Sequence, residues 1–164
     1  MIRKHKKYAR PRKAFDKHRI DEEVQIKQQF GLKNKREIWK AEAKVAIMRR
    51  RAKELITASS EDKEKFFEKL QAVGLLVKNI SDVLALTKED ILRRRLQTVV
   101  HQKKLAQSAK GARQLITHKK VLVEGRVINA PSYLVPTHVE NTISVKPMKI
   151  RVPASEKKAE EIAV

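Results

Sequence analysis

The chain has 164 residues, a formal net charge of +20 at pH 7 and no cysteine. Its length suits one domain or one domain with an extension, and its charge indicates a polyanionic partner such as a nucleic acid. The composition excludes disulfides and thiolate metal sites, and without the roughly 20 apolar residues of a membrane-spanning helix we expect neither membrane insertion nor secretion.

Residues 1–19 are strongly basic, with Asp16 as their single acid. Such a segment has too little apolar surface to offset the entropy of ordering, so we expect a basic N-terminal arm that is mobile by itself. Its candidate nucleic-acid contacts are Lys6, Lys7, Arg10 and Arg12. Tyr8 and Phe15 interleave with these charges, and each ring can either stack on an unpaired base or anchor the arm to its own domain.

Residues 20–93 are expected to form a helical N-terminal domain. Asp21 is a plausible cap for a first helix, which Gly31 ends. A longer helix follows, since apolar residues recur at three-to-four spacing, namely Ile38, Ala41, Val45, Met48, Ala52 and Leu55. Arg49, Arg50 and Arg51 span most of its circumference, so one or two of them should face the nucleic acid. Trp39 is interpreted as a core or subunit contact rather than a base-stacking residue.

A third helix, opening at Ser60, is close to charge balance and should face solvent or protein. A short helix at 81–86 follows, and Thr87 with Asp90 forms a capping box for the next one. The apolar residues in this region should join the two parts of the chain into one core: Leu84, Leu86, Ile91 and Leu92.

Residues 94–145 are predicted to form two short helices followed by a β-hairpin. Leu96, Val99 and Val100 give the first buried stripe; Ala109, Ala112, Leu115 and Ile116 give the second. Ser108 is a suitable N-cap for the second helix. The apolar period then changes to two, with Glu124-Gly125 as the turn between 121–123 and 126–128. Ile143 and Val145 should return to the sheet as a strand. The fold class is therefore mainly α with a small β-hairpin or sheet, an α+β protein.

Positive charge is concentrated on this unit. Between residues 91 and 128, Glu124 is the single acid against ten basic residues: Arg93, Arg94, Arg95, Lys103, Lys104, Lys110, Arg113, Lys119, Lys120 and Arg126. Burying that many unpaired cations is too costly, so we expect them to coat the outside, where a polyanion would neutralise them.

The same residues resemble the αL RNA-binding motif, in particular its copy in the family of small-subunit ribosomal protein four. The matching residues are Ala112-Arg113-Gln114-Leu115, His118, Val121-Leu122-Val123, Gly125 and Pro131-Ser132-Tyr133. Outside the motif, residues 31–39 and Arg94-Arg95-Leu96-Gln97-Thr98 are similar to the archaeal and eukaryotic branch of that family. Lys104 departs from the family pattern, which usually has glycine in the turn between the two helices, and Lys119-Lys120 replace a pair such as Gly-His.

The resemblance implies a cytoplasmic, non-enzymatic constituent of the small ribosomal subunit that binds small-subunit ribosomal RNA, nucleates assembly and contributes to translational accuracy. It also implies neighbouring ribosomal proteins as partners, with protein five among them, and messenger RNA where it enters the subunit. The candidate RNA contacts in the motif are Arg94, Arg95, Lys103, Lys104, Ser108, Lys110, Arg113, His118, Lys119, Lys120 and Arg126.

No catalytic constellation is evident in the sequence. The five histidines lack metal-ligand spacing, so we expect neither a metal site nor a cofactor. Residues 146–164 should form a flexible tail. Two alternatives stay open. The motif could be the RNA-binding module of an RNA-modifying enzyme, although the remainder leaves no room for a catalytic domain, or the chain could be a chromosomal or stress-related protein that binds other RNA or duplex DNA.

Overall fold

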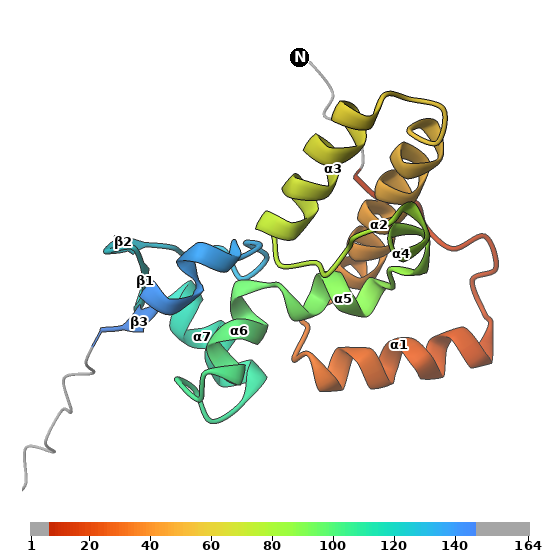
Figure 1. The fold of residues 1–164 in the computed structure, drawn as a ribbon. Coiled ribbons are helices and arrows are strands. Elements are labelled where there is room, and N and C mark those ends of the chain that lie inside the picture. Colours follow the sequence, from red (N-terminus) through yellow and green to blue (C-terminus); the bar gives the residue numbers. More distant parts are fainter. Residues whose placement is uncertain (1–6, 147–164) are drawn as a thin grey trace, which may run out of the picture.

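In residues 7–146, the part of the chain that the computed structural model describes, α-helices precede a small antiparallel sheet, and a 3-10 helix lies between its last two strands in the sequence (Figure 1). The helices are α1 (Lys17–Gln29), α2 (Arg36–Glu54), α3 (Ser60–Ala72), α4 (Ile80–Ala85), α5 (Lys88–Arg93), α6 (Leu96–Gln102), α7 (Ala109–Thr117) and the 3-10 helix η1 (Thr137–Thr142). The strands are β1 (Val121–Val123), β2 (Arg126–Val127) and β3 (Ser144–Val145). The expected α+β class is confirmed.

The predicted apolar stripe organises the N-terminal part, residues 7–93. On α2, Ile38, Ala41, Val45 and Ala52 are buried, and the helix packs against α4 and α5. The resulting N-terminal core contains Ile26, Phe30, Leu32, Ile38, Ala41, Val45, Ala52, Leu70, Leu75, Val77, Val83, Leu86, Ile91 and Leu92. Phe66 and Phe67 of α3 cover it at the edge, as an amphipathic helix of this length requires.

The C-terminal unit, residues 94–146, has its own core. α6 packs against α7, and the sheet has the order β2-β1-β3 with antiparallel pairing throughout. This C-terminal core consists of Leu96, Val99, Val100, Ala112, Ile116, Val121, Val123, Val135, Val139 and Ile143. The expected hairpin and returning strand are both present, with Leu122 opposite Val127 on one side and Val121 opposite Val145 on the other.

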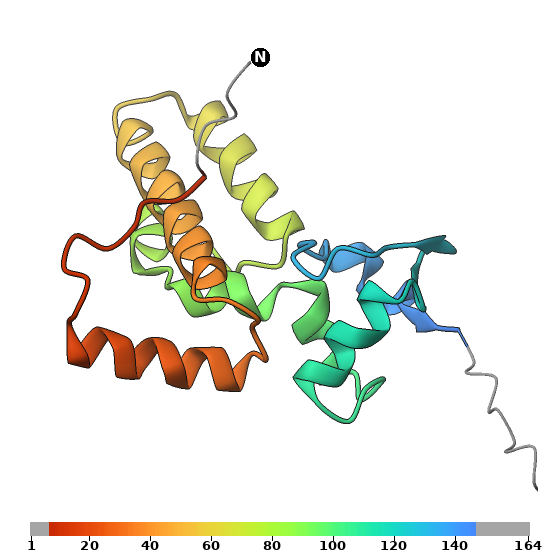
Figure 2. The same cartoon turned by 180° about the vertical axis from the view of Figure 1, so that it is seen from behind.

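Two cores instead of one correct the sequence-based interpretation. Leu86, Ile91 and Leu92 are buried in the N-terminal core and Leu84 packs against it. Leu134 of the C-terminal unit packs against the same core, so the two parts touch there without sharing one core. Figures 1 and 2 show that the chain passes from one part to the other through α5 and α6. At the junction between α5 and α6, Leu134 forms an isolated antiparallel β-bridge with Arg95. The Val135 N–H also donates to the Arg94 carbonyl at 3.0 Å.

Local signals set most helix ends. Ser108 caps α7, since its hydroxyl accepts from the Gly111 N–H at 3.0 Å, and Thr87 with Asp90 forms the predicted capping box. The helix ends at Lys104 and Lys119 have left-handed backbones, with φ of 57° and 58°. Lysine thus occupies the conformation for which glycine is preferred, at a cost of about 1 kcal/mol.

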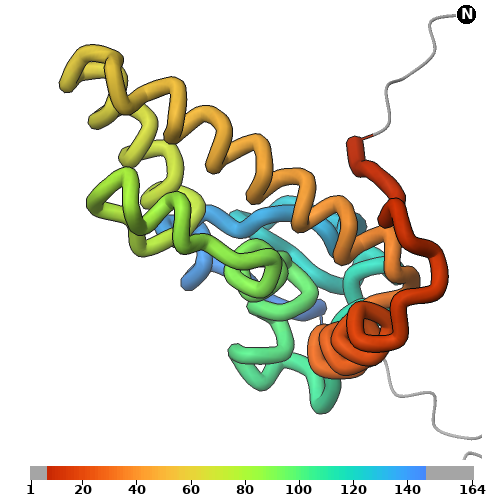
Figure 3. The backbone as a smooth tube through the Cα atoms, turned by 90° about the vertical axis from the view of Figure 1, so that its right-hand side faces the viewer, coloured from red at the N-terminus to blue at the C-terminus, as the bar shows by residue number. Residues whose placement is uncertain are grey.

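The arm is shorter than expected. α1 begins at Lys17 instead of near Asp21, because the Asp16 main-chain carbonyl already accepts from the Ile20 N–H and Arg19 pairs with Glu23 one turn on. The described arm is therefore residues 7–16, and Figure 3 shows it running beside α2. The predicted tail lies outside the described residues except for Lys146.

Candidate nucleic-acid interface

A charged clamp centred on Glu37 holds the two parts together. Glu37, in the first turn of α2, accepts from Arg95 at 2.5 Å and from Arg113 of α7 at 3.0 Å. The three side chains are 16%, 6% and 24% exposed respectively. Arg113 also donates to the Gln97 side-chain oxygen at 3.2 Å. One carboxylate from the N-terminal part thus pairs with two arginines from the C-terminal unit.

Gln97 extends the clamp through main-chain carbonyls. Its side chain is buried, and its amide nitrogen lies 3.0, 2.9 and 3.0 Å from the carbonyl oxygens of Phe30, Gly31 and Ala109. Gly31 has φ of +60°, and a Cβ added there would lie 2.8 Å from the Ala109 Cβ. Glycine is therefore required where the turn after α1 meets the start of α7.

Arg94 forms a second tie. Its guanidinium donates to the Val73 and Val135 carbonyls, each at 2.9 Å, and to the Glu140 carboxylate at 3.0 Å. These contacts connect the end of α3 to η1. The expectation that every cation of this unit coats the outside is therefore wrong for three of them, because Arg94, Arg95 and Arg113 form ion pairs and hydrogen bonds within the fold. The acids that neutralise them are Glu37 and Glu140, which lie outside residues 91–128, the segment in which Glu124 is the single acid.

The clamp changes the ionisation of its carboxylate. Burial by itself would raise the pKa of Glu37, but hydrogen bonds from Arg113 and Arg95 outweigh it and lower the pKa from its ordinary value. Glu37 is therefore held as an anion, the form that keeps both arginines neutralised.

A basic cleft of about 510 Å³ lies beside the clamp. Cations from the arm, α2 and the C-terminal unit line it: Lys7, Arg36, Lys40, Lys44, Arg95 and Arg113, with Glu37 as the acid of the lining. Desolvation lowers the pKa of Lys44 from its ordinary value, and the charges of Arg95 and Lys7 lower it further. Positive charge is thus crowded here beyond what Glu37 compensates, which makes the cleft attractive to phosphate.

Sequence reasoning missed three residues of this cleft. Arg36, Lys40 and Lys44 recur every fourth position, so they form one basic stripe on α2. That spacing is visible in the sequence, but the sequence analysis considered only the apolar stripe and the three consecutive arginines of this helix, and it predicted Arg49–Arg51 as the nucleic-acid contacts.

Several predicted contacts of the C-terminal unit are exposed. Lys104, Lys110, His118, Lys119 and Arg126 lie at the surface. Two others are half-buried, Lys120 and Lys103, and the Lys103 ammonium donates to the Glu140 carbonyl. Ser108, also predicted as a contact, serves as the α7 cap.

The arm is anchored by its aromatic ring. Tyr8 lies 6.0 Å from Trp39 between ring centroids, and the Trp39 indole donates to Glu23 at 2.9 Å. Trp39 therefore packs within the fold, as predicted, and Tyr8 takes the anchoring alternative, whereas Phe15 is 97% exposed. Lys7, Arg10 and Arg12 remain at the surface, and Lys6 lies outside the described residues.

The three consecutive arginines have separate partners. Arg49 donates to the Leu86 carbonyl at 2.7 Å, and thereby fastens α2 to the end of α4. Arg50 and Arg51 are exposed and approach Glu54 at 3.7 and 3.3 Å. Exposed pairs of this kind contribute little to stability, so both guanidinium groups are available to an external anion.

The part of the chain that the structure describes contains no cluster of three or more His, Cys, Asp or Glu side chains placed to hold a metal ion. None of its helices is long and apolar enough to cross a membrane.

Comparison with known proteins gives one consistent result. Residues 94–140 match the family model of the S4 domain. The chain is 44% identical over 149 residues to small ribosomal subunit protein uS4 of Thermoplasma acidophilum, a match that spans 85% of this chain and 75% of that protein. It is 41% identical over 162 residues to the protein of the same name from Methanothermobacter thermautotrophicus, a match that spans 92% of this chain and 94% of that protein. It is 44% identical over 149 residues to the protein of the same name from Methanococcus aeolicus, which spans 87% of this chain and 84% of that protein.

Proposed function

Since the chain belongs to the family of small ribosomal subunit protein uS4, we propose that it is a structural constituent of the small ribosomal subunit that binds small-subunit ribosomal RNA directly. The observation that carries the proposal is the gathering of Lys7, Arg36, Lys40 and Lys44 around one cleft whose acid, Glu37, is already paired with two arginines. Phosphate groups would relieve the repulsion among these cations, and they would release counterions as they bind.

The binding surface has two sections. The basic cleft offers Lys7, Arg36, Lys40 and Lys44, and the C-terminal unit offers Lys104, Lys110, Lys119 and Arg126 as exposed cations. Because the clamp fixes the two parts relative to each other, RNA that spans both sections would be selected for its shape. Phosphate contacts of this kind set position and register and carry little base-sequence information.

Family membership favours the ribosomal interpretation over the two alternatives. The relatives match along most of the chain, so the helical part is shared with them and is not a catalytic domain joined to an RNA-binding module. We further propose, from the resemblance, a role in nucleating subunit assembly and in translational accuracy, with protein five as a neighbour and messenger RNA passing close by.

The test is the affinity for small-subunit ribosomal RNA, titrated across salt concentrations with duplex DNA as competitor. We expect binding that survives the competitor, with a salt dependence equivalent to several phosphate contacts. Equal affinity for both nucleic acids would refute a ribosomal RNA binder and favour a chromosomal protein.

A matched pair of variants locates the surface. Lys110→Glu/Lys119→Glu and Lys65→Glu/Lys69→Glu change the net charge equally, but the second pair consists of exposed residues of α3 that belong to neither section of the proposed surface. We expect the first pair to reduce the salt dependence by about two phosphate contacts and the second to leave it unchanged. Equal effects would mean that overall charge, and no particular surface, controls binding.

A further inference from the structure

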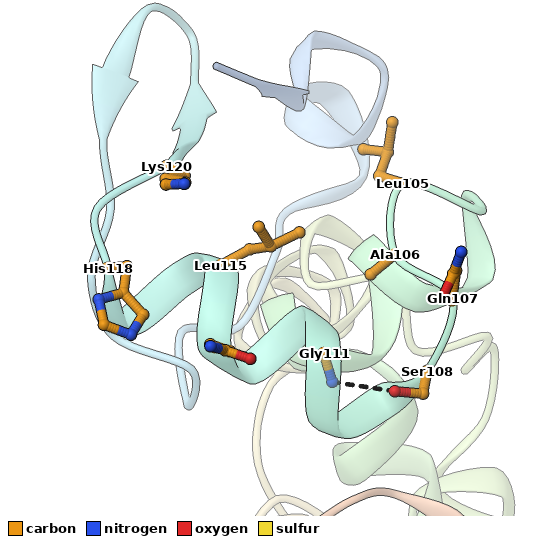
Figure 4. Close-up of a pocket in the computed structure, with 9 residues that line it drawn as sticks. Leu105, Ala106, Gln107, Ser108, Gly111, Leu115, His118 and Lys120 are labelled. Carbon is orange, nitrogen blue, oxygen red and sulfur yellow. Dashed lines mark hydrogen bonds between the residues drawn. The ribbon is translucent and has the colours of Figure 1, made fainter. Parts of the chain in front are cut away.

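A groove of about 590 Å³ opens on the C-terminal unit between the turn after α6 and the second half of α7 (Figure 4). Leu105 and Ala106 come from the turn, and Leu115 of α7 lies opposite them. Gln107, Gln114 and Lys120 add polar groups to the lining. The groove therefore combines an apolar floor with hydrogen-bonding groups at its edges.

Backbone hydrogen bonds fix both walls. The Leu105 N–H donates to the Val100 carbonyl at 3.2 Å as the chain leaves α6, and the Lys120 N–H donates to the Leu115 carbonyl at 3.0 Å as it leaves α7. Both bonds close helix ends of the kind that a left-handed residue completes, here Lys104 and Lys119. The groove is therefore formed before any ligand arrives.

The apolar floor is unusual in its surroundings. Leu105 is 36% exposed, and Leu115, which the sequence placed in a buried stripe, is half-buried and faces the groove. The described residues of the lining include no acid, and Lys104, Lys110 and Lys119 flank it in the chain. Leu115 also packs against the C-terminal core, so Leu105 is the exposed leucine of the pair. A surface that contacted phosphate alone would need the lysines and would have no use for an apolar wall.

An unpaired base has the chemistry that this lining complements. Its faces are apolar, its edge carries amide-like donors and acceptors, and its phosphate is anionic. We propose that the groove binds one unpaired nucleotide of the RNA, with the base between Leu105 and Leu115 and its edge toward Gln107 and Gln114. The His118 ring, at the end of the groove, offers a second surface for stacking. This inference rests on the proposed function and deepens it, because it adds a contact with a base to contacts with phosphate.

The test uses Gln107→Ala/Gln114→Ala in the full chain. Both glutamines are exposed, so the variant should fold normally. The net charge is unchanged, so electrostatic attraction is preserved. Gln28→Ala/Gln102→Ala is the matched control, with two exposed glutamines elsewhere on the helices.

The probes are a short single-stranded RNA of mixed sequence and a blunt RNA duplex, measured at the same salt concentration. We expect the groove variant to bind the single strand about tenfold more weakly, in the range for loss of contacts to one base edge, and the duplex with unchanged affinity. The control variant should bind both probes as the wild type does.

Two results would overturn the inference. Unchanged affinity of the groove variant for the single strand would leave the groove to some other occupant, such as a protein side chain. An equal loss for single strand and duplex would make it part of the phosphate-binding surface. Failure of the proposed function has a different signature, since it appears in the wild type as equal affinity for ribosomal RNA and duplex DNA.

Discussion

Removing the Glu37 carboxylate should destabilise the fold more than any other single change of a charged residue proposed for this chain. In Glu37→Gln, Arg95 keeps its charge with a side chain only 6% exposed, and Arg113 loses its anionic partner at 3.0 Å. Breaking a buried ion pair from one side costs about 3–5 kcal/mol. Because Arg113 can turn partly toward solvent and the amide still accepts one hydrogen bond, we expect about 3 kcal/mol.

The measurement is urea denaturation followed by far-ultraviolet circular dichroism, with thermal melting as a second readout. A loss of about 3 kcal/mol corresponds to a fall in Tm of roughly 6–12 °C for a chain of this size. Glu54→Gln is the control, since Glu54 is 52% exposed and its pairs with Arg50 and Arg51 are worth little. It should change stability by less than about 0.5 kcal/mol.

A double variant separates the loss of the pair from the penalty of an isolated charge. Glu37→Leu/Arg95→Met replaces the carboxylate and the more buried of its two arginines by apolar side chains of similar size, which is often neutral or stabilising, while Arg113, with a side chain 24% exposed, can turn toward solvent. We expect it to recover most of the stability that Glu37→Gln loses. A Glu37→Gln variant as stable as Glu54→Gln, or a double variant as unstable as Glu37→Gln, would refute the view that the clamp carries a buried, compensated charge.

Three further predictions concern charge and backbone conformation. Lys104→Gly should raise the free energy of unfolding by about 1 kcal/mol in the same denaturation assay, because glycine adopts a φ of 57° without strain; Lys104→Ala, which also removes the charge, should not. Lys44→Met should raise stability by up to about 0.5 kcal/mol and lower the salt dependence of RNA binding by about one phosphate contact, and unchanged salt dependence would remove Lys44 from the binding surface. The pKa of Glu37 is lower in the folded chain than its ordinary value of 4.5, so the stabilisation that the ionised carboxylate gives the fold is complete above that pH and is lost as pH falls through the lowered pKa. The difference in unfolding free energy between the wild type and Glu37→Gln should therefore shrink in acid. A constant difference down to pH 2 would contradict the pairing.

The clamp also explains why an RNA-binding chain with a net charge of +20 uses some of its arginines in ion pairs within the fold. The two cores are separate clusters, and Leu134 of the C-terminal unit packs against the N-terminal one. Apolar packing has no preferred direction, so it does not by itself fix one part against the other. Glu37, Gln97 and Arg94 supply directional bonds across the junction. Directional bonds define one arrangement of the two proposed binding sections, which a shape-selective RNA contact needs.

Features that depend on near neighbours could be predicted from the sequence. The Ser108 cap, the Thr87–Asp90 capping box and the Glu124-Gly125 turn each involve residues within three positions of one another, and all are present. The apolar stripe of α2 was equally accessible, because helical periodicity and burial are linked by geometry. The basic character of the chain and its family resemblance needed no coordinates either.

Contacts between distant residues were decided by the tertiary structure. Arg95 and Arg113 find their acid 58 and 76 positions away, so a count of charges within one segment treated them as free cations. The basic cleft depends on the same packing, since it takes residues from the arm, α2 and the C-terminal unit. Composition determines that positive charge must reach the surface or find a partner, and the three-dimensional arrangement determines which cations do each, because electrostatic compensation acts over a few ångströms of space and not along the chain.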